Sequence, residues 1–422
     1  MRKANALHLA ILLIMATFLY AATPAWGQQF LYKGFHFTDK RDKRVSIPFE
    51  LHSNLIVVPV RVNNGEPLKF ILDTGVRTAI LTNKIYVDSL PRPSDRVINL
   101  MGAGNAGQIS AFVSSNISFT LPEGVEAMGN SLLVLKEDYL QLDSFLGVRI
   151  HGILGYELFS RFVVEIDYIH QKMILHDPEH FRPRRSFDVI EMKVKDTKPY
   201  IEACSLKVND STYVSLRLLV DTGASHSLLL HTYTSDSIEV PEKNIEGYLG
   251  RGLSGEIYGY LGRIKALKID DYELESVIAS FPEESEFSKS ILLQAGQNGN
   301  IGGSVLKRFR VIFDYANEKM YIKKNRLFRK EFEYNMSGME LMATGPLLSS
   351  LMVAKITKNG PADRAGLREG DLIIAVNGRR SPELDLSVYS ELVNRRPGKK
   401  IRVKVLRSGK LIKKQFSLER VL

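Results

Sequence analysis

The sequence predicts an all-β body of two lobes, followed by a small mixed α+β domain. Three observations support this fold class: an internal duplication, short runs of β-branched and aromatic residues, and a change of pattern after residue 322. The chain has 422 residues, of which 44% are hydrophobic and 25% are charged, as in ordinary globular proteins. This composition excludes a disordered chain, a collagen and a multi-span membrane protein.

The duplication consists of four segments that recur at an offset of 148 residues, or 147 for the last two. The pairs of segments are 70–75 and 218–223, 102–107 and 250–255, 152–155 and 299–302, and 162–173 and 309–320. Chance does not keep four segments in one register, so we expect two homologous lobes.

Each lobe is expected to be rich in strands. Runs such as 56–62 and 68–72 contain many β-branched residues and are bounded by Gly, Asn and Asp turns. A short helix is expected after the last glycine of the third segment in each lobe, at 156–161 and 304–308. The stretch 177–186, rich in proline and arginine, is the expected connection between the lobes.

Each copy of the first segment ends in Asp-Thr-Gly, which places Asp73 and Asp221 after apolar strands. Two close carboxylates share one proton, because two like charges cannot both ionise cheaply. The ionised partner can take a proton from water while the protonated partner donates to a scissile carbonyl. We therefore expect hydrolysis of peptide bonds by a water molecule activated between Asp73 and Asp221, with the two roles interchangeable.

The residues after each aspartate suit this chemistry. Gly75 and Gly223 permit a tight turn at the end of an apolar strand. Thr74 and Thr222 can exchange hydrogen bonds across the interface between the lobes and so fix the pair.

With these motifs the chain resembles the pepsin and retropepsin superfamily of aspartic peptidases over roughly residues 45–325. The hydrophobic segments ending at Gly155 and Gly302 match the ψ-shaped loop that threads beside the catalytic turn in that family. The resemblance implies a bilobal, double-β-barrel-like body, an aspartic endopeptidase, a protein or peptide substrate, and neither a cofactor nor a metal. It also places Ser225 at the small hydrogen-bonding position that supports the aspartates.

The glycine-rich segments begin 29 residues after each aspartate, where that family carries its flap hairpin over the cleft. The flap glycines implied by the resemblance are Gly102, Gly104, Gly107, Gly250, Gly252 and Gly255. A dinucleotide-binding loop is excluded, because neither copy has the strand–helix context or the acidic ribose partner. Two matching segments imply a fused, retropepsin-like arrangement with two flaps that open and close.

The two turns differ at one position, where Ser225 of the second copy is replaced by Arg77 in the first. A cation near the aspartates would favour their ionised forms, unless it turns away to an acidic partner. Arg77 therefore keeps an alternative open, a catalytically inactive peptidase fold that acts as a binding or scaffold protein. Arg77 and His226 are also candidate subsite residues, and Arg77 would suit acidic substrate side chains.

The C-terminal segment resembles a PDZ domain of the bacterial type attached to peptidases. The resemblance rests on residues 360–367 and 370–378, and it implies that a peptide C-terminus or an internal segment adds to an edge strand. Substrate recruitment is the expected role. The loop expected to bind the peptide contains Gly338 and Met339, with Leu341 on the strand that follows.

The N-terminus predicts export from the cytoplasm. Arg2 and Lys3 precede an apolar run over residues 7–22, and Ala25 and Gly27 suit cleavage after Gly27. A single membrane anchor is disfavoured because the run is short and interrupted. We expect a secreted protein, periplasmic or extracellular, with no cysteine for lipid attachment near the cut.

The expected domains follow from these features. They are a signal peptide at 1–27, lobe 1 at 28–180, lobe 2 at 187–322, a linker at 323–334 and the PDZ domain at 335–422. Within the net charge of +10, residues 336–422 carry 17 Lys and Arg against 8 Asp and Glu. This excess either attracts an acidic partner or an anionic membrane surface, or keeps the domain soluble. Nucleic acid is not an expected partner.

Two further features are given structural roles. Cys204 is the only cysteine and lies in an apolar stretch, so we expect a buried thiol and not a nucleophile. Residues 176–180 contain two histidines, an aspartate and a glutamate around a proline, in the expected inter-lobe connection. We expect a solvated loop there and not a zinc site.

Overall fold

The computed structural model describes residues 34–83, 96–100, 102, 104, 108–209, 211–283, 289, 293, 296–394 and 396–422. Residues 34–422 form one compact unit. The expected signal peptide at 1–27 lies outside the described residues. In the part of the chain that is described, no helix has the length and apolar character needed to cross a bilayer.

The first lobe is a sheet that folds back on itself. Its strands are β1 (Gly34–Phe37), β3 (Glu50–His52), β4 (Leu55–Val62), β5 (Pro67–Leu72), β6 (Ile80–Leu81), β7 (Val97–Leu100), β8 (Ile109–Leu121), β9 (Val125–Leu135) and β10 (Gly152–Leu154). The long strand β8 pairs with β4, β7 and β9, which curls the sheet around the buried rings of Phe70 and Phe119. Two short helices, α2 (Leu142–Leu146) and α3 (Tyr156–Phe159), flank β10 along the chain.

The second lobe repeats the arrangement. Its elements are β14 (Lys198–Lys207), β15 (Tyr213–Val220), β16 (Leu228–Leu230), η2 (Thr232–Thr234), β17 (Asn244–Gly252), β18 (Gly255–Arg263), β19 (Ala266–Ile269), β20 (Tyr272–Glu275), β21 (Ile278–Pro282), β22 (Gly299–Ile301) and α5 (Gly303–Leu306). The parallel pair β5–β10 of the first lobe corresponds to the parallel pair β15–β22 of the second. Cys204 is buried in β14, as expected.

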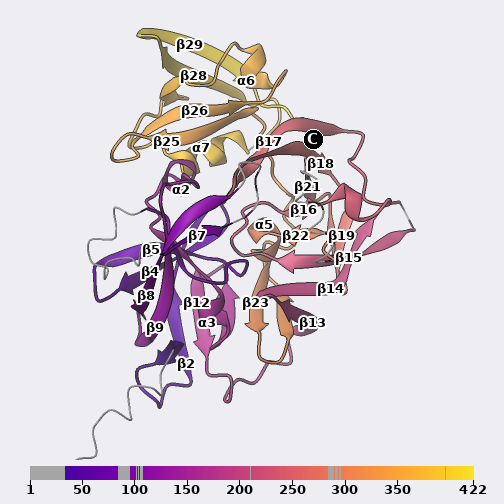
Figure 1. Cartoon of the computed structure of the whole chain (residues 1–422). Helices are drawn as coiled ribbons and strands as arrows, with labels where there is room; N and C mark the ends of the chain where they lie inside the picture. Colours follow the sequence, from indigo (N-terminus) through magenta and orange to yellow (C-terminus); the bar gives the residue numbers. More distant parts are fainter. Residues whose placement is uncertain are drawn as a thin grey trace, which may run out of the picture. The chain divides into compact units, whose positions relative to one another are not determined.

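A sheet shared by both lobes joins them. Its strands are β2 (Arg44–Pro48), β11 (Val163–Asp167), β12 (Lys172–His176), β13 (Asp188–Lys195), β23 (Phe309–Asp314) and β24 (Lys319–Lys324). Their order is β13-β24-β23-β11-β12-β2, so the duplicated fourth segments, β11 and β23, lie side by side and antiparallel. Figure 1 labels β2, β12, β13 and β23 of this sheet in its lower half.

A buried ionic cluster crosses the join between β11 and β23. Arg310 Nε contacts Glu165 Oε1 at 2.5 Å, and its Nη1 lies 3.2 Å from Asp167 Oδ2. The other Glu165 oxygen lies 2.8 Å from His176 Nε2. Burial alone would raise the pKa of Glu165, but the hydrogen bond to His176 and the charge of Arg310 outweigh it and hold that pKa below its usual value.

The C-terminal domain has its own sheet and core. Its elements are β25 (Met339–Thr344), β26 (Ser350–Ile356), α6 (Pro361–Arg364), β27 (Leu372–Val376), α7 (Leu386–Val393), β28 (Lys400–Arg407) and β29 (Lys410–Ser417). The strands follow one another in the order β25-β26-β27-β28-β29, which leaves β25 at one edge (Figure 1). Side chains from β25, β26, β28 and α7 form a hydrophobic cluster separate from that of the lobes.

The linker before this domain is anchored to the second lobe. Phe332 is buried, and the guanidinium of Arg308 lies 3.6 Å from the centre of its ring. Arg263 donates to the carbonyl of Phe332 at 2.9 Å. The all-β prediction is confirmed, and the two expected short helices form as α3 and α5.

We predict that Arg310→Met destabilises the fold by about 3–5 kcal/mol, because it leaves the buried carboxylates of Glu165 and Asp167 without their cation. Lys193→Met is the matched control, since Lys193 pairs with Glu318 on the exposed surface of the same sheet. Its expected effect is about 0–1 kcal/mol. Urea unfolding at pH 7 measures both, and equal effects would contradict the role assigned to Arg310.

Candidate active site

The two aspartates of the duplicated turns occupy equivalent places in the two lobes. Asp73 follows β5 and Asp221 follows β15. The backbone N–H of Asp73 donates to Leu154 at the end of β10, and that of Asp221 donates to Ile301 at the end of β22, both at 2.9 Å. The hydrophobic segments before Gly155 and Gly302 therefore lie beside the aspartate turns.

Thr74 and Thr222 link the two turns across the interface between the lobes. Thr74 Oγ1 donates to the carbonyl of Val220 at 2.6 Å, and Thr222 Oγ1 donates to that of Leu72 at 2.8 Å. Each hydroxyl also accepts the backbone N–H of the opposite threonine, at 3.0 and 3.1 Å. Both side chains are buried, so water cannot replace these four bonds.

The linked turns bring the carboxylates close together. A methyl group added at Gly75 would lie 3.0 Å from Asp73 Oδ1 and 3.8 Å from Asp221 Oδ1. One added at Gly223 would collide with the carboxylate of Asp73, which belongs to the other lobe. Position 223 must therefore be glycine, because any side chain there would prevent Asp73 from coming close to the second turn. Burial, and next the charge of Asp221, raise the pKa of Asp73 to about 7.

Arg77 does not join the aspartates. Its side chain is exposed, and in the part of the chain that is described it makes no hydrogen bond or ion pair with Asp73 or Asp221. The charge of Lys198, at the start of β14, acts to lower the pKa of Asp73, but burial and the charge of Asp221 outweigh it. The sequence analysis did not single out Lys198, because this residue belongs to the second lobe and comes near Asp73 only when the two lobes pack together.

Ser225 lies on the exposed loop after the second turn. Its carbonyl accepts a hydrogen bond from Asn54 Nδ2 of the first lobe at 2.8 Å. Among the described residues, its hydroxyl contacts neither aspartate. A side chain that the sequence analysis did not single out, Asn300, instead donates from Nδ2 to Asp221 Oδ2 at 2.9 Å. His226, a predicted subsite residue, is partly buried beside Asp221 and Asn300.

The two glycine-rich segments meet at their tips. Strands β17 and β18 form a hairpin that turns at Leu253 and Ser254. Gly102 donates from its backbone N–H to Ser254 Oγ at 3.1 Å, and a methyl group at Gly104 would lie 2.5 Å from the backbone of Ser254. Gly107 lies outside the described residues. The two described glycines of the first segment, Gly102 and Gly104, therefore lie against the turn of the β17–β18 hairpin.

The second flap also contacts the C-terminal domain. Lys355 of β26 lies 3.5 Å from Glu256 Oε2 and donates to the hydroxyl of Tyr258 at 3.1 Å, both in β18. Near the end of β17, Arg251 donates to the carbonyl of Tyr139 in the first lobe at 3.2 Å. The hairpin therefore has contacts on both sides, to the first lobe and to the C-terminal domain.

The loop expected to capture a peptide terminus is occupied by internal bonds. The backbone N–H of Met336 donates to Val393, that of Ser337 to Asn335 Oδ1, and that of Met339 to Ser337 Oγ. Gly338 has a φ of 66° at the turn, and the Met339 and Leu341 side chains face the domain core. In this conformation the loop offers few free donors to a carboxylate.

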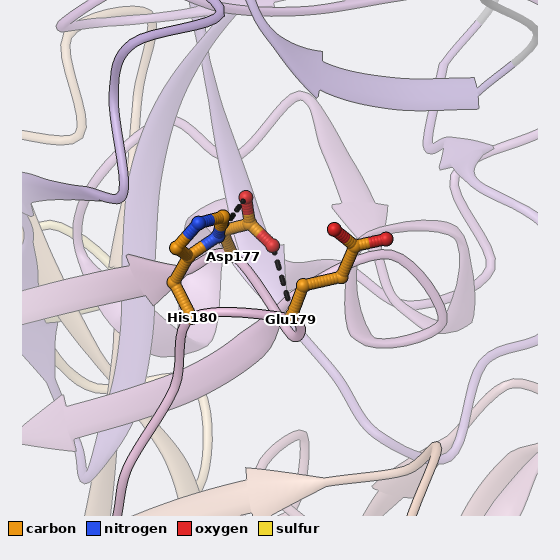
Figure 2. Close-up of side chains that lie close together, drawn as sticks. All are labelled: Asp177, Glu179 and His180. Carbon is orange, nitrogen blue, oxygen red and sulfur yellow. Dashed lines mark hydrogen bonds and ion pairs between the residues drawn. The ribbon is translucent and has the colours of Figure 1, made fainter.

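The residues in the inter-lobe connection form an exposed turn. Asp177, Glu179 and His180 have their oxygen and nitrogen ligand atoms within 4.8 Å of one another. Figure 2 shows that Asp177 faces His180 and the backbone of Glu179. Asp177 Oδ2 lies 3.0 Å from His180 Nδ1, and its Oδ1 accepts the N–H of Glu179 at 2.9 Å. These bonds join Asp177 to the side chain of His180 and to the backbone of Glu179.

Two comparisons bear on this geometry. Residues 204–305 match a family model described as aspartyl protease, and residues 352–407 match one described as PDZ domain. The first match includes Asp221, the β17–β18 flap and Asn300. The two matches agree with the predicted combination: part of the second lobe is similar to aspartyl proteases, and the C-terminal domain is similar to PDZ domains.

We predict that Gly104→Ala opens the contact between the flap tips, because the added methyl overlaps the backbone of Ser254. An overlap worth about 1–3 kcal/mol corresponds to roughly 5–150-fold faster amide hydrogen exchange at residues 252–255. Gly250→Ala is the control, since Gly250 also has a positive φ, 150°, but open space around it. Equal exchange in the two variants would show that the tips do not touch in solution.

Proposed function

We propose that this protein is an aspartic endopeptidase that cleaves peptide bonds of proteins or peptides. The observation that carries the proposal is the approach of Asp73 and Asp221, one from each lobe, held by the bonds between Thr74 and Thr222. A merely structural pair of carboxylates this close together would be costly, because two like charges repel each other and cannot both ionise cheaply. Such a cost is typical of a functional site.

The proposed reaction uses one proton shared by the two aspartates. The ionised carboxylate takes a proton from water, whose oxygen bonds to the peptide carbon, while the carboxylic acid donates its proton to the carbonyl oxygen. In the second step the gem-diol returns a proton to the carboxylate that lost one. The other aspartate passes its proton to the nitrogen, and the carbon–nitrogen bond breaks.

The flaps supply the other part of the mechanism. Closed over the aspartates, the tips at Gly102 and Ser254 exclude bulk water, and exposed backbone groups of the hairpins can hold an extended substrate. Opening requires the tips to part. Glycines with positive φ at Gly104, Gly250 and Gly255 permit the necessary backbone change.

The alternative function, an inactive scaffold, rested on a cation at the aspartates. Arg77 is exposed, and among the described residues it contacts neither carboxylate, which supports the enzyme over the scaffold. We further propose that the protein is exported by its N-terminal segment. In this proposal the PDZ domain recruits substrate, and the contact of Lys355 with Glu256 and Tyr258 couples it to the second flap.

We predict that Asp73→Asn and Asp221→Asn each abolish cleavage, because either change removes one of the two proton carriers. Mass spectrometry of a proteome-derived peptide library, digested from pH 3 to 8, measures cleavage and specificity together. Asp236→Asn, on an exposed turn of the second lobe, is the matched control and should cleave like the unaltered protein. A folded protein that cuts nothing across this range would contradict the proposal.

We also predict that cleavage declines as the pH rises through about 7. The pKa of Asp73 is raised to about 7, so the proton needed for the carbonyl is present below that pH and is lost above it. The rate constant kcat/KM should then fall about tenfold for each further pH unit. A rate that keeps rising to pH 9 would argue against a shared carboxylic proton.

A further inference from the structure

The two aspartates have unequal surroundings, although their turns are duplicated. Asp73 Oδ1 accepts the N–H of Gly75 at 2.6 Å, and Asp221 Oδ1 accepts that of Gly223 at 3.0 Å. Asp221 has a second donor, the side-chain amide of Asn300, at 2.9 Å from Oδ2. Both aspartates therefore accept a hydrogen bond from a backbone N–H group, but among the described residues only Asp221 also accepts one from a side chain.

The difference comes from the sequence of the third duplicated segment. Asn300 pairs with Leu219 in β15, and its counterpart Ile153 pairs with Ile71 in β5, so the two occupy the same position in their lobes. Ile153 is buried and has no polar group to offer. A hydrogen bond to the charged form of a carboxylate favours that form, so only Asp221 has this support.

The amide group of Asn300 can face Asp221 in only one orientation. A carboxylate only accepts hydrogen bonds, so the NH2 group must face Asp221 and the oxygen must face away. That oxygen, Asn300 Oδ1, is buried without a hydrogen-bond partner among the described residues, and so is His226 Nε2. An unpaired acceptor thus stands beside an unpaired imidazole nitrogen.

His226 can supply the missing donor when it is neutral. Burial lowers the pKa of His226, the charge of Asp221 and the neighbouring side chain of Asn300 act to raise it, and His231 lowers it further. A neutral imidazole with its proton on Nε2 donates to Asn300 Oδ1. The chain of donors then runs from His226 through Asn300 to Asp221.

We propose that Asn300 is a positioning residue that gives the two aspartates fixed and different roles, with His226 orienting its amide. Asp221 is the ionised carboxylate that takes the proton from water, and Asp73 is the acid that donates to the scissile carbonyl. The inference rests on the proposed endopeptidase function. The gem-diol then returns a proton to Asp73, and Asp221 passes its own to the leaving nitrogen, which restores the starting state.

The test is the pH dependence of kcat/KM for Asn300→Leu, with a peptide identified in the library digest. The acidic limb of the profile, which reports the ionised aspartate, should move upward by about 1–2 pH units, because a charged hydrogen bond is lost. The optimum rate should fall roughly 10–100-fold. The alkaline limb, which follows Asp73 under the charges of Asp221 and Lys198, should stay in place.

Two further variants separate positioning from packing. Ile153→Leu alters the same position of the first lobe with little change in volume, and it should leave both limbs unchanged. His226→Gln should move the acidic limb in the same direction as Asn300→Leu but by less. A rate loss with both limbs in place would overturn the proposal, because a structural defect lowers the rate without moving a titration.

A second measurement tests the proposal without activity, in case the protein cleaves no peptide or a variant does not fold. Carbon-13 NMR of labelled aspartate carboxyls follows the resonance that disappears in Asp221→Asn, without any substrate. That resonance should titrate at higher pH in Asn300→Leu, and in Asn300→Ala if the leucine variant does not fold. An unchanged titration overturns the role of Asn300, whereas a shifted titration in a protein that cuts nothing overturns only the endopeptidase function.

Discussion

The hydrogen bonds between Thr74 and Thr222 are the interaction on which the rest of the site depends. Each threonine lies in one lobe and bonds to the strand and to the backbone N–H of the other. Separating the lobes would break all four of these buried hydrogen bonds. The two carboxylates are therefore held together by neighbours that carry no charge, and burial together with the repulsion from Asp221 raises the pKa of Asp73.

Duplication supplies the symmetry of the site, and single substitutions remove it. The backbone frame of β5 and β10 is repeated in β15 and β22, down to the pairing of their residues. The side chains that differ are Asn300 against Ile153, and Arg77 against Ser225. A symmetric pair has no preference for which carboxylate holds the proton. The fused chain, unlike a dimer of identical copies, can place a donor beside only one of them.

The flap of the second lobe connects the site to the C-terminal domain. Ser254 at its turn contacts Gly102 of the first glycine-rich segment, and Glu256 and Tyr258 of β18 contact Lys355. The loop expected to bind a peptide uses the N–H groups of Met336, Ser337 and Met339 in internal hydrogen bonds. Binding of a peptide terminus to these groups would require the loop to rearrange.

Local patterns along the chain already predict the two lobes, the position of both aspartates after strands, and the change to a separate C-terminal domain. These follow from local patterns, since the register of the repeats and the Asp-Thr-Gly turns are read along the chain. Only the tertiary structure placed Lys198 near Asp73, turned Arg77 to solvent and set Asn300 rather than Ser225 against Asp221. Those contacts join residues from different strands and lobes. Their distances depend on how the strands pair and how the lobes pack, and a local sequence pattern does not specify either.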